Sequence, residues 1–150
     1  MYEAPAIEAN PAQTRSMFDT NVFGLFDMVS AFTPLLLASD SINTRTPPLV
    51  INTSSIVSHL PFAFSAAYNA SKAAVASYSD TLRIELDPLG IKVVTLFIGE
   101  VATNLMSADN VSFNPESLYI DTLEATKERS RNHAKESIGI CQTSGATDPV

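Results

Sequence analysis

Apolar residues recur at helical spacing in the first third of the chain. They follow one another at alternating separations of four and three residues: Phe18, Val22, Leu25, Val29, Phe32 and Leu36. This spacing puts their side chains on one face of a helix. Asn10 and Pro11 precede the pattern as an N-cap and a first helical residue. We therefore expect a helix from Pro11 to about Ala38, with Pro34 kinking or loosening its last turns.

Two short, continuous apolar runs come later in the sequence, and both predict buried strands. The first begins at Leu49 and ends near Thr53, and the second spans Ile91–Ile98. Between them, Ser65–Leu86 is rich in alanine and amphipathic, which predicts a helix, and Asp87–Gly90 should end it. A strand, a helix of about 20 residues and a second strand form a βαβ unit with parallel neighbouring strands. The expected fold class is α/β.

The remaining segments are less regular. Ser39–Pro48 is a polar loop that ends in two prolines. A helix is expected from Pro115 to about Lys135, and the small, polar tail Thr143–Val150 should be frayed.

Composition narrows the classes of function. The 150 residues carry a net charge of −7, which disfavours a nucleic-acid surface or an anionic membrane face. Cys141 is the only cysteine, so no internal disulfide can form and a reducing compartment is expected. No signal peptide or transmembrane span is apparent, and no Cys, His or Asp cluster has metal-ligand spacing.

Three residues could carry acid–base chemistry. Tyr68 and Lys72 are four residues apart near the start of a predicted helix, so they lie on one face. A nearby cation lowers the pKa of a tyrosine, which is otherwise about 10. Ser55 follows the first strand, at the edge of the sheet where α/β proteins bind ligands. There it could hold a substrate oxygen while Tyr68 exchanges a proton, which suits reduction of a carbonyl with hydride from a nicotinamide. Each feature alone is common by chance.

The joint pattern resembles the short-chain dehydrogenases/reductases. Its three signatures occur here in the family's order: Asn21-Val-Phe-Gly24, Val50-Ile-Asn-Thr-Ser-Ser55 and Tyr68-Asn-Ala-Ser-Lys72. The resemblance covers roughly Tyr2 to Lys127. It implies a partial, doubly wound Rossmann-type sheet and a single partial domain over residues 1–150.

The resemblance also implies roles for individual residues. Tyr68 would be the general acid/base, and Lys72 would lower its pKa and bind the nicotinamide ribose. Ser55 would orient the substrate carbonyl, and Asn21 would help to hold a water in the proton relay. Val101 and Thr103 would contact the cofactor from the loop that begins at Ile98, where the family usually has proline.

Within the family, the chain resembles fungal proteins of the NADPH-dependent 1-acyldihydroxyacetone-phosphate reductase type in four stretches, Ala31–Ser39, Tyr68–Ala74, Ser79–Arg83 and Pro115–Tyr119. This similarity implies NADPH as cofactor, with NAD not excluded, and a lipid-like carbonyl substrate. It implies a substrate lid at about residues 104–135 and dimerisation through the first two helices. It also implies a cytoplasmic protein that can associate peripherally with lipid droplets or the endoplasmic reticulum.

The sequence departs from the family in one important respect. It has only five glycines and no Gly-rich turn of the Thr-Gly-x-x-x-Gly-x-Gly kind, although the pyrophosphate of a dinucleotide needs such a turn. The first four strands of the family are expected to be missing. We therefore expect a chain of marginal stability that associates readily and is weak or inactive as an enzyme.

Two alternatives stay open. The chain could be a non-catalytic fragment that associates with full-length relatives through its first two helices. A hydrolase built on Ser55 is a poorer fit, because no histidine is placed as its base and no nucleophile-elbow motif surrounds it.

Overall fold

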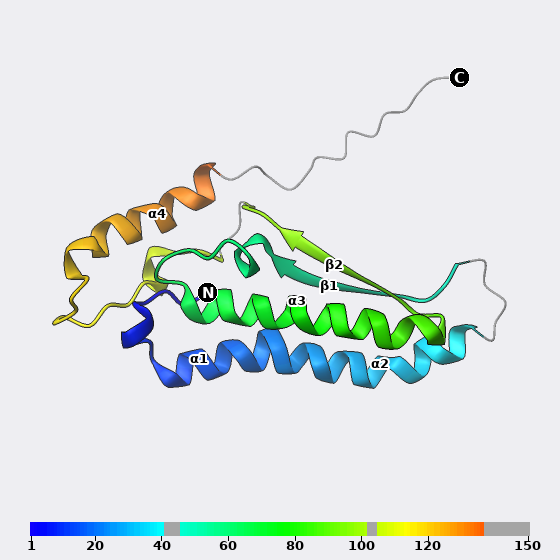
Figure 1. Cartoon of the computed structure of the whole chain (residues 1–150). Coiled ribbons are helices and arrows are strands. Elements are labelled where there is room, and N and C mark those ends of the chain that lie inside the picture. Colours follow the sequence, from blue (N-terminus) through cyan, green and yellow to red (C-terminus); the bar gives the residue numbers. More distant parts are fainter. Residues whose placement is uncertain (41–45, 102–104, 137–150) are drawn as a thin grey trace, which may run out of the picture.

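The computed structural model describes residues 1–40, 46–101 and 105–136. Its main elements are α1 (Pro11–Phe18), α2 (Gly24–Asp40), β1 (Leu49–Ser55), α3 (Ala66–Leu86), β2 (Lys92–Ile98) and α4 (Leu123–Glu136). Short 3-10 turns lie at Ala6–Glu8, Ile56–Ser58, Asp87–Leu89, Ala108–Asn110 and Ile120–Thr122. Figure 1 shows α2 and α3 on the same side of the strands, and α4 at the end of the molecule where α3 begins.

The two strands are parallel neighbours, as expected. Their register pairs Leu49 with Lys92 and Ser55 with Ile98, so both carboxyl ends meet at one edge of the sheet. The βαβ unit and the α/β class are confirmed. β1 ends at Ser55, two residues beyond the predicted end.

The first predicted helix is interrupted, though not where proline was expected to disturb it. Asn10 caps α1 by accepting hydrogen bonds from the backbone nitrogens of Ala12 and Gln13 at 2.9 and 3.2 Å. A π-helical segment, Asp19–Phe23, then joins α1 to α2. α2 continues through Pro34 to Asp40, because proline removes only one backbone donor and the neighbouring turns keep theirs.

A small apolar core joins α2, α3 and the strands. Its buried members are Val29, Leu82, Leu86, Ile91 and Val93, and partly buried side chains of Leu25, Leu36, Val50 and Tyr78 pack against them. The rings of Phe26 and Tyr78 stack with centroids 4.1 Å apart, which adds a contact between α2 and α3.

The predicted end of α3 is confirmed. Gly90 has a left-handed backbone with φ of 75°, which allows the chain to turn from the helix into β2.

A buried polar contact holds α3 against β1. Asn52 in β1 is 2 % exposed and donates to the hydroxyl of Ser79 at 2.9 Å. Ser79 in turn donates to the carbonyl of Val75 within α3 at 2.7 Å. Since buried polar groups are costly unless they are paired, this chain of bonds favours one position of the helix on the strand.

The predicted helix start at Pro115 is wrong. Helix α4 begins at Leu123, and the preceding residues form turns. The Asn114 side chain accepts from the backbone nitrogen of Glu116 at 3.1 Å, and the Ser117 hydroxyl accepts from that of Tyr119 at 3.0 Å. Such local bonds compete with helical ones. The predicted tail, 143–150, lies outside the described residues.

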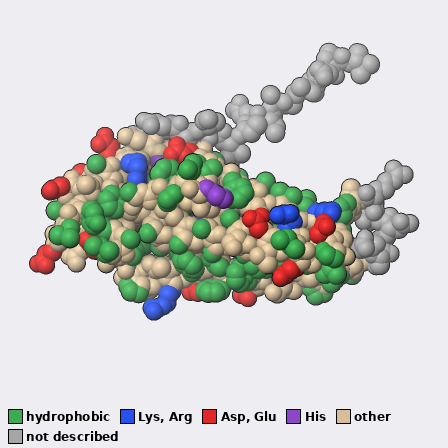
Figure 2. Space-filling view, in the orientation of Figure 1, with side chains coloured by type: hydrophobic (Ala, Val, Ile, Leu, Met, Phe, Trp, Pro, Cys, Tyr) green, Lys and Arg blue, Asp and Glu red, His purple; other side chains and the backbone are tan. Residues whose placement is uncertain are grey.

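One face of the two strands and one face of α2 are left uncovered. On the strands, Leu49, Ile51, Val94, Leu96 and Ile98 are 38–55 % exposed. On α2, Met28, Phe32 and Leu35 are 49–64 % exposed. Figure 2 shows hydrophobic side chains along the lower edge of the molecule, where α2 lies in Figure 1. Because parallel sheets are normally covered on both faces, these surfaces favour association.

One helical stretch in the described part of the chain has the length and composition of a membrane span. It is Pro11–Ala38, in which a window of 18 residues has a mean hydropathy of 1.5. A single such helix is weak evidence, because core helices of globular proteins meet the same criteria. The prediction that no segment spans a membrane stays a prediction.

Replacing Leu82 by alanine should lower the free energy of unfolding by about 2–5 kcal/mol, because it opens a cavity in the core. The matched variant Ile84→Ala, on the same helix but 68 % exposed, should change it by about 0.5 kcal/mol or less. Urea unfolding followed by circular dichroism, repeated at two protein concentrations, measures both. Equal losses for the two variants would contradict the described packing of α3.

Candidate active site

A cavity of about 240 Å³ opens at the carboxyl ends of the two strands. Ser55, Tyr68 and Lys72 all line it, so the fold brings together residues that are up to 17 positions apart. The other lining side chains are mostly apolar and include those of Met1, Phe62, Ile98, Val101, Leu105 and Met106. The cavity lies where open α/β sheets bind ligands.

Ser55 is positioned by the end of β1. Its hydroxyl donates to the carbonyl of Ile98, the paired residue of β2, at 3.2 Å. It also accepts from the backbone nitrogen of Val57 at 3.4 Å and thereby caps the short turn that follows. Because the proton is directed at a backbone carbonyl and not at a base, this geometry argues against the hydrolase alternative.

Tyr68 and Lys72 lie in the first two turns of α3. A second contact with β1 holds this end of the helix, since the Ser54 hydroxyl donates to the carbonyl of Lys72 at 3.0 Å. The Lys72 ammonium donates to the carbonyl of Thr53 at 3.1 Å and lies 5.8 Å from the centre of the Tyr68 ring. The phenol and the ammonium therefore face the same cavity.

Burial shifts the pKa of both groups. Burial raises the pKa of Tyr68, and the opposing effect of a hydrogen bond with Ser55 is smaller. Burial also lowers the pKa of Lys72. The net shift of the Tyr68 pKa is upward because desolvation of the phenolate outweighs the hydrogen bond with Ser55, and the expected lowering of this pKa by Lys72 stays a prediction. The phenol is protonated at neutral pH and can donate a hydrogen bond.

Asn21 lies in the π-helical segment Asp19–Phe23. Its side-chain nitrogen donates to the Ser71 hydroxyl at 3.0 Å, and Ser71 donates to the carbonyl of Tyr68 at 2.8 Å. Asn21 thus supports the backbone that carries Tyr68. Its expected contact with a relay water stays a prediction.

The site suits one end of a nicotinamide dinucleotide better than the other. Tyr68 and Lys72 offer a hydroxyl and an ammonium for a ribose, and Val101 lines the same cavity. Thr103 lies outside the described residues. A pyrophosphate needs glycines that allow close backbone approach, but a Cβ atom on Gly99 would meet nothing within 4 Å. Gly24 is helical and Gly90 serves a turn. The described residues therefore fit the nicotinamide and its ribose, without a glycine cradle for the phosphates.

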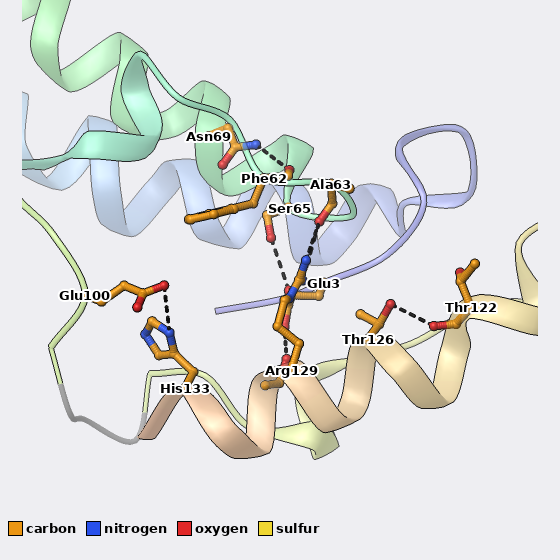
Figure 3. Close-up of polar contacts among 11 residues, drawn as sticks. Glu3, Phe62, Ala63, Ser65, Asn69, Glu100, Thr122, Thr126, Arg129 and His133 are labelled. Atoms are coloured by element: carbon orange, nitrogen blue, oxygen red, sulfur yellow. Dashed lines mark hydrogen bonds and ion pairs between the residues drawn. The ribbon is translucent and has the colours of Figure 1, made fainter. Parts of the chain in front are cut away.

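Sequence reasoning missed two polar residues of the cavity. His133 from α4 and Glu100 from the segment after β2 both line it, and their side chains are 3.5 Å apart (Figure 3). No motif marks them, because they are 33 positions apart and meet only in the folded chain.

Comparison with known proteins places the chain in a family. The sequence model of short chain dehydrogenases matches residues 2–112. A short-chain dehydrogenase of Neurospora crassa is 37 % identical over 132 residues, which are 88 % of this chain and 42 % of the relative. The NADPH-dependent 1-acyldihydroxyacetone phosphate reductase of Schizosaccharomyces pombe is 42 % identical over 104 residues, which are 69 % of this chain and 33 % of the relative.

A solved structure agrees with this assignment. The crystal structure of a short-chain dehydrogenase from Streptomyces avermitilis superposes with a TM-score of 0.68 at 27 % identity, covering 93 % of this chain and 48 % of that protein. The chain thus spans less than half the length of these relatives. Since the family model covers well over half of the chain and the fold agrees, the protein belongs to the short-chain dehydrogenase family.

Proposed function

We propose that this chain carries the proton-transfer site of an oxidoreductase that reduces a carbonyl to an alcohol with NADPH. The observation that supports it most directly is the shared cavity of Ser55, Tyr68 and Lys72 at the carboxyl ends of both strands. The family uses a nicotinamide dinucleotide, and the relative from Schizosaccharomyces pombe is named for its dependence on NADPH.

In the proposed reaction, Ser55 and Tyr68 act at the substrate oxygen, and Lys72 acts at the ribose and the phenolate. The Ser55 hydroxyl turns from the Ile98 carbonyl to the substrate oxygen and holds it beside Tyr68. Tyr68 donates its proton to that oxygen as negative charge develops there. Lys72 is free to bind the ribose once its ammonium leaves the Thr53 carbonyl, and its charge then stabilises the phenolate left after proton transfer. When bound, NADPH would supply the hydride for the carbonyl carbon.

The lining of the cavity supports an apolar, lipid-like substrate. Phe62, Leu105 and Met106 line the same cavity as Ser55 and Tyr68. An acyl or alkyl chain would be desolvated against these side chains while its carbonyl reaches the hydroxyls. Segment 104–135, of which the structure describes all but the first residue, contributes Leu105, Met106 and His133 and would act as the substrate lid.

The 150 residues by themselves would bind NADPH weakly, because they contain no Gly-rich turn for its pyrophosphate. A second candidate role is therefore association with another copy or with a longer relative through the first two predicted helices, which correspond to α1–α2 and to α3. The exposed apolar side chains of α2, namely Met28, Phe32 and Leu35, support this role.

The Tyr68→Phe variant tests the catalytic role. It should lower the rate of NADPH-dependent ketone reduction by about 10²–10⁴-fold, because the proton donor is lost. Oxidation of NADPH, followed by its absorbance, measures the rate. Tyr78→Phe is the matched control, since Tyr78 lies on the same helix but packs against Phe26. If wild type and Tyr68→Phe turn over a ketone at similar rates, Tyr68 is not the acid.

The raised pKa of Tyr68 gives a second prediction. Since burial favours the neutral phenol, the part of the alkaline ultraviolet titration that disappears in Tyr68→Phe should have its midpoint above that of a free tyrosine. The Lys72→Met variant should leave this midpoint nearly unchanged in the cofactor-free chain. A midpoint below the ordinary value, or one that rises strongly in Lys72→Met, would show that the lysine charge outweighs burial.

The association role is tested separately. Replacing Phe32 by aspartate should weaken self-association at least tenfold in sedimentation equilibrium, because a charge is placed on the apolar face of α2. Ile7→Asp, at a residue that is 74 % exposed outside these helices, serves as the control. Tyr68→Phe should leave association unchanged. A wild-type chain that is monomeric at all concentrations refutes the role.

A further inference from the structure

Glu3 is a fully buried carboxylate whose partners come from two distant segments. Its Oε1 accepts from the Ser65 hydroxyl at 3.2 Å and from Nη2 of Arg129 at 2.5 Å. Its Oε2 accepts from the Ser130 hydroxyl at 2.5 Å. Ser65 precedes α3, whereas Arg129 and Ser130 belong to α4. We call Glu3, Ser65, Arg129 and Ser130 the Glu3 anchor (Figure 3).

Burial of the Glu3 carboxylate is unfavourable unless all members of the anchor are present. A buried carboxylate loses its hydration and needs both a counter-charge and hydrogen bonds to compensate. Ser65 and Ser130 are 2 % and 0 % exposed, so their hydroxyls have little access to solvent. Because Arg129 and Ser130 reach Glu3 only when α4 is docked, burial of the carboxylate is coupled to the position of that helix.

Backbone contacts bring the same residues together. Glu3 donates its backbone N–H to the carbonyl of Asn110 at 3.0 Å, and Ala4 donates to that of Phe64 at 2.8 Å. Phe64 has a φ of 64°, a left-handed backbone that is unfavourable for a bulky residue. Its ring packs against those of Phe113 and Tyr119, with centroids 5.0 and 5.7 Å apart. The residues just before α3 are thus held in an unusual conformation by the N-terminal segment and by the chain that leads to α4.

The anchor borders the cavity. Ser65 lines the cavity and precedes Tyr68 by three residues. Arg129 lies 3.5 Å from the Ala63 carbonyl through both terminal nitrogens, which ties α4 to the loop before α3. His133 follows Arg129 by one helical turn and lines the cavity beside Glu100. Any shift of α4 that breaks the anchor would therefore move His133 away from the cavity.

We propose that Glu3 is a positioning residue that docks α4 at the start of α3 and so makes His133 a wall of the substrate cavity. The assignment of this cavity to a substrate rests on the proposed function, whereas the docking of α4 does not. Glu3 touches none of the proposed reacting groups, so it acts on the shape of the cavity and not on proton transfer.

The test uses Glu3→Gln in the 150-residue chain. Hydrogen exchange with mass spectrometry should show at least tenfold faster exchange of the amides of residues 123–133, because glutamine has no charge to pair with Arg129 and keeps only one of the two acceptor oxygens. Exchange in β1, β2 and the last three turns of α3 should change less than twofold. The affinity for 2-decanone, a simple apolar ketone, should fall at least fivefold in ligand-observed nuclear magnetic resonance.

Glu8→Gln is the matched control. Glu8 lies in the same N-terminal segment and accepts from the Ser117 hydroxyl at 2.6 Å, so its loss should affect residues 114–119 and spare α4. Ser130→Ala removes one donor and keeps the Arg129 pair, so it should give a smaller increase in exchange, again confined to α4. It also serves where Glu3→Gln fails to fold.

The outcomes separate the proposals. Uniformly faster exchange in both Glu3→Gln and Ser130→Ala would mean that Glu3 only stabilises the fold. Faster exchange confined to α4 with unchanged ketone affinity would mean that α4 is not a wall of the cavity. Either result overturns the inference. Failure of the catalytic proposal would instead appear as unchanged turnover in Tyr68→Phe, with the exchange pattern of Glu3→Gln preserved.

Discussion

The packing of α3 against β1 is the contact on which the rest of the structure depends. Two hydrogen bonds, from Asn52 to Ser79 and from Ser54 to the carbonyl of Lys72, join the strand to the helix. They lie on the side of the strand that faces α3, where the helix offers small residues and allows close approach. If the helix moved by one turn, both bonds would be lost and the polar groups of β1 would stay buried without partners. The same contact sets Tyr68 and Lys72 beside the end of the strand that carries Ser55.

The fold brings the phenol of Tyr68, the ammonium of Lys72 and the hydroxyl of Ser55 to one small cavity. Burial there raises the pKa of Tyr68 and lowers that of Lys72. Both shifts disfavour charge, so the phenol keeps its proton at neutral pH. The lysine charge is directed at the Thr53 carbonyl, and the expected help to the phenolate would follow only after this contact is exchanged for another. Membership of the short-chain dehydrogenase family agrees with this reading of the residues.

One end of the molecule is held together by buried polar contacts, whereas apolar surfaces are exposed elsewhere. At this end, the N-terminal segment, the loop before α3 and helix α4 meet at Glu3, whose carboxylate accepts hydrogen bonds from Ser65, Arg129 and Ser130. Elsewhere, the outer faces of the strands and of α2 expose apolar side chains. These surfaces have the character of interior faces, because parallel strands are normally covered on both sides. The relatives are more than twice as long as the aligned part of this chain.

Local patterns were enough to predict much of this protein. The apolar runs that became β1 and β2, the alanine-rich helix between them and the turn at Gly90 all follow from short-range rules, and the Tyr68, Lys72 and Ser55 signature pointed to the family. Three features followed from tertiary structure alone. Helix α4 begins eight residues later than predicted, and the turns before it are held by Glu8, which accepts from the backbone nitrogen of Asn114 and from the hydroxyl of Ser117. The pKa of Tyr68 rises because burial, which no spacing encodes, outweighs its favourable contacts. Glu3 meets Arg129 across 126 positions, since a buried charge is paired only when the whole chain has folded.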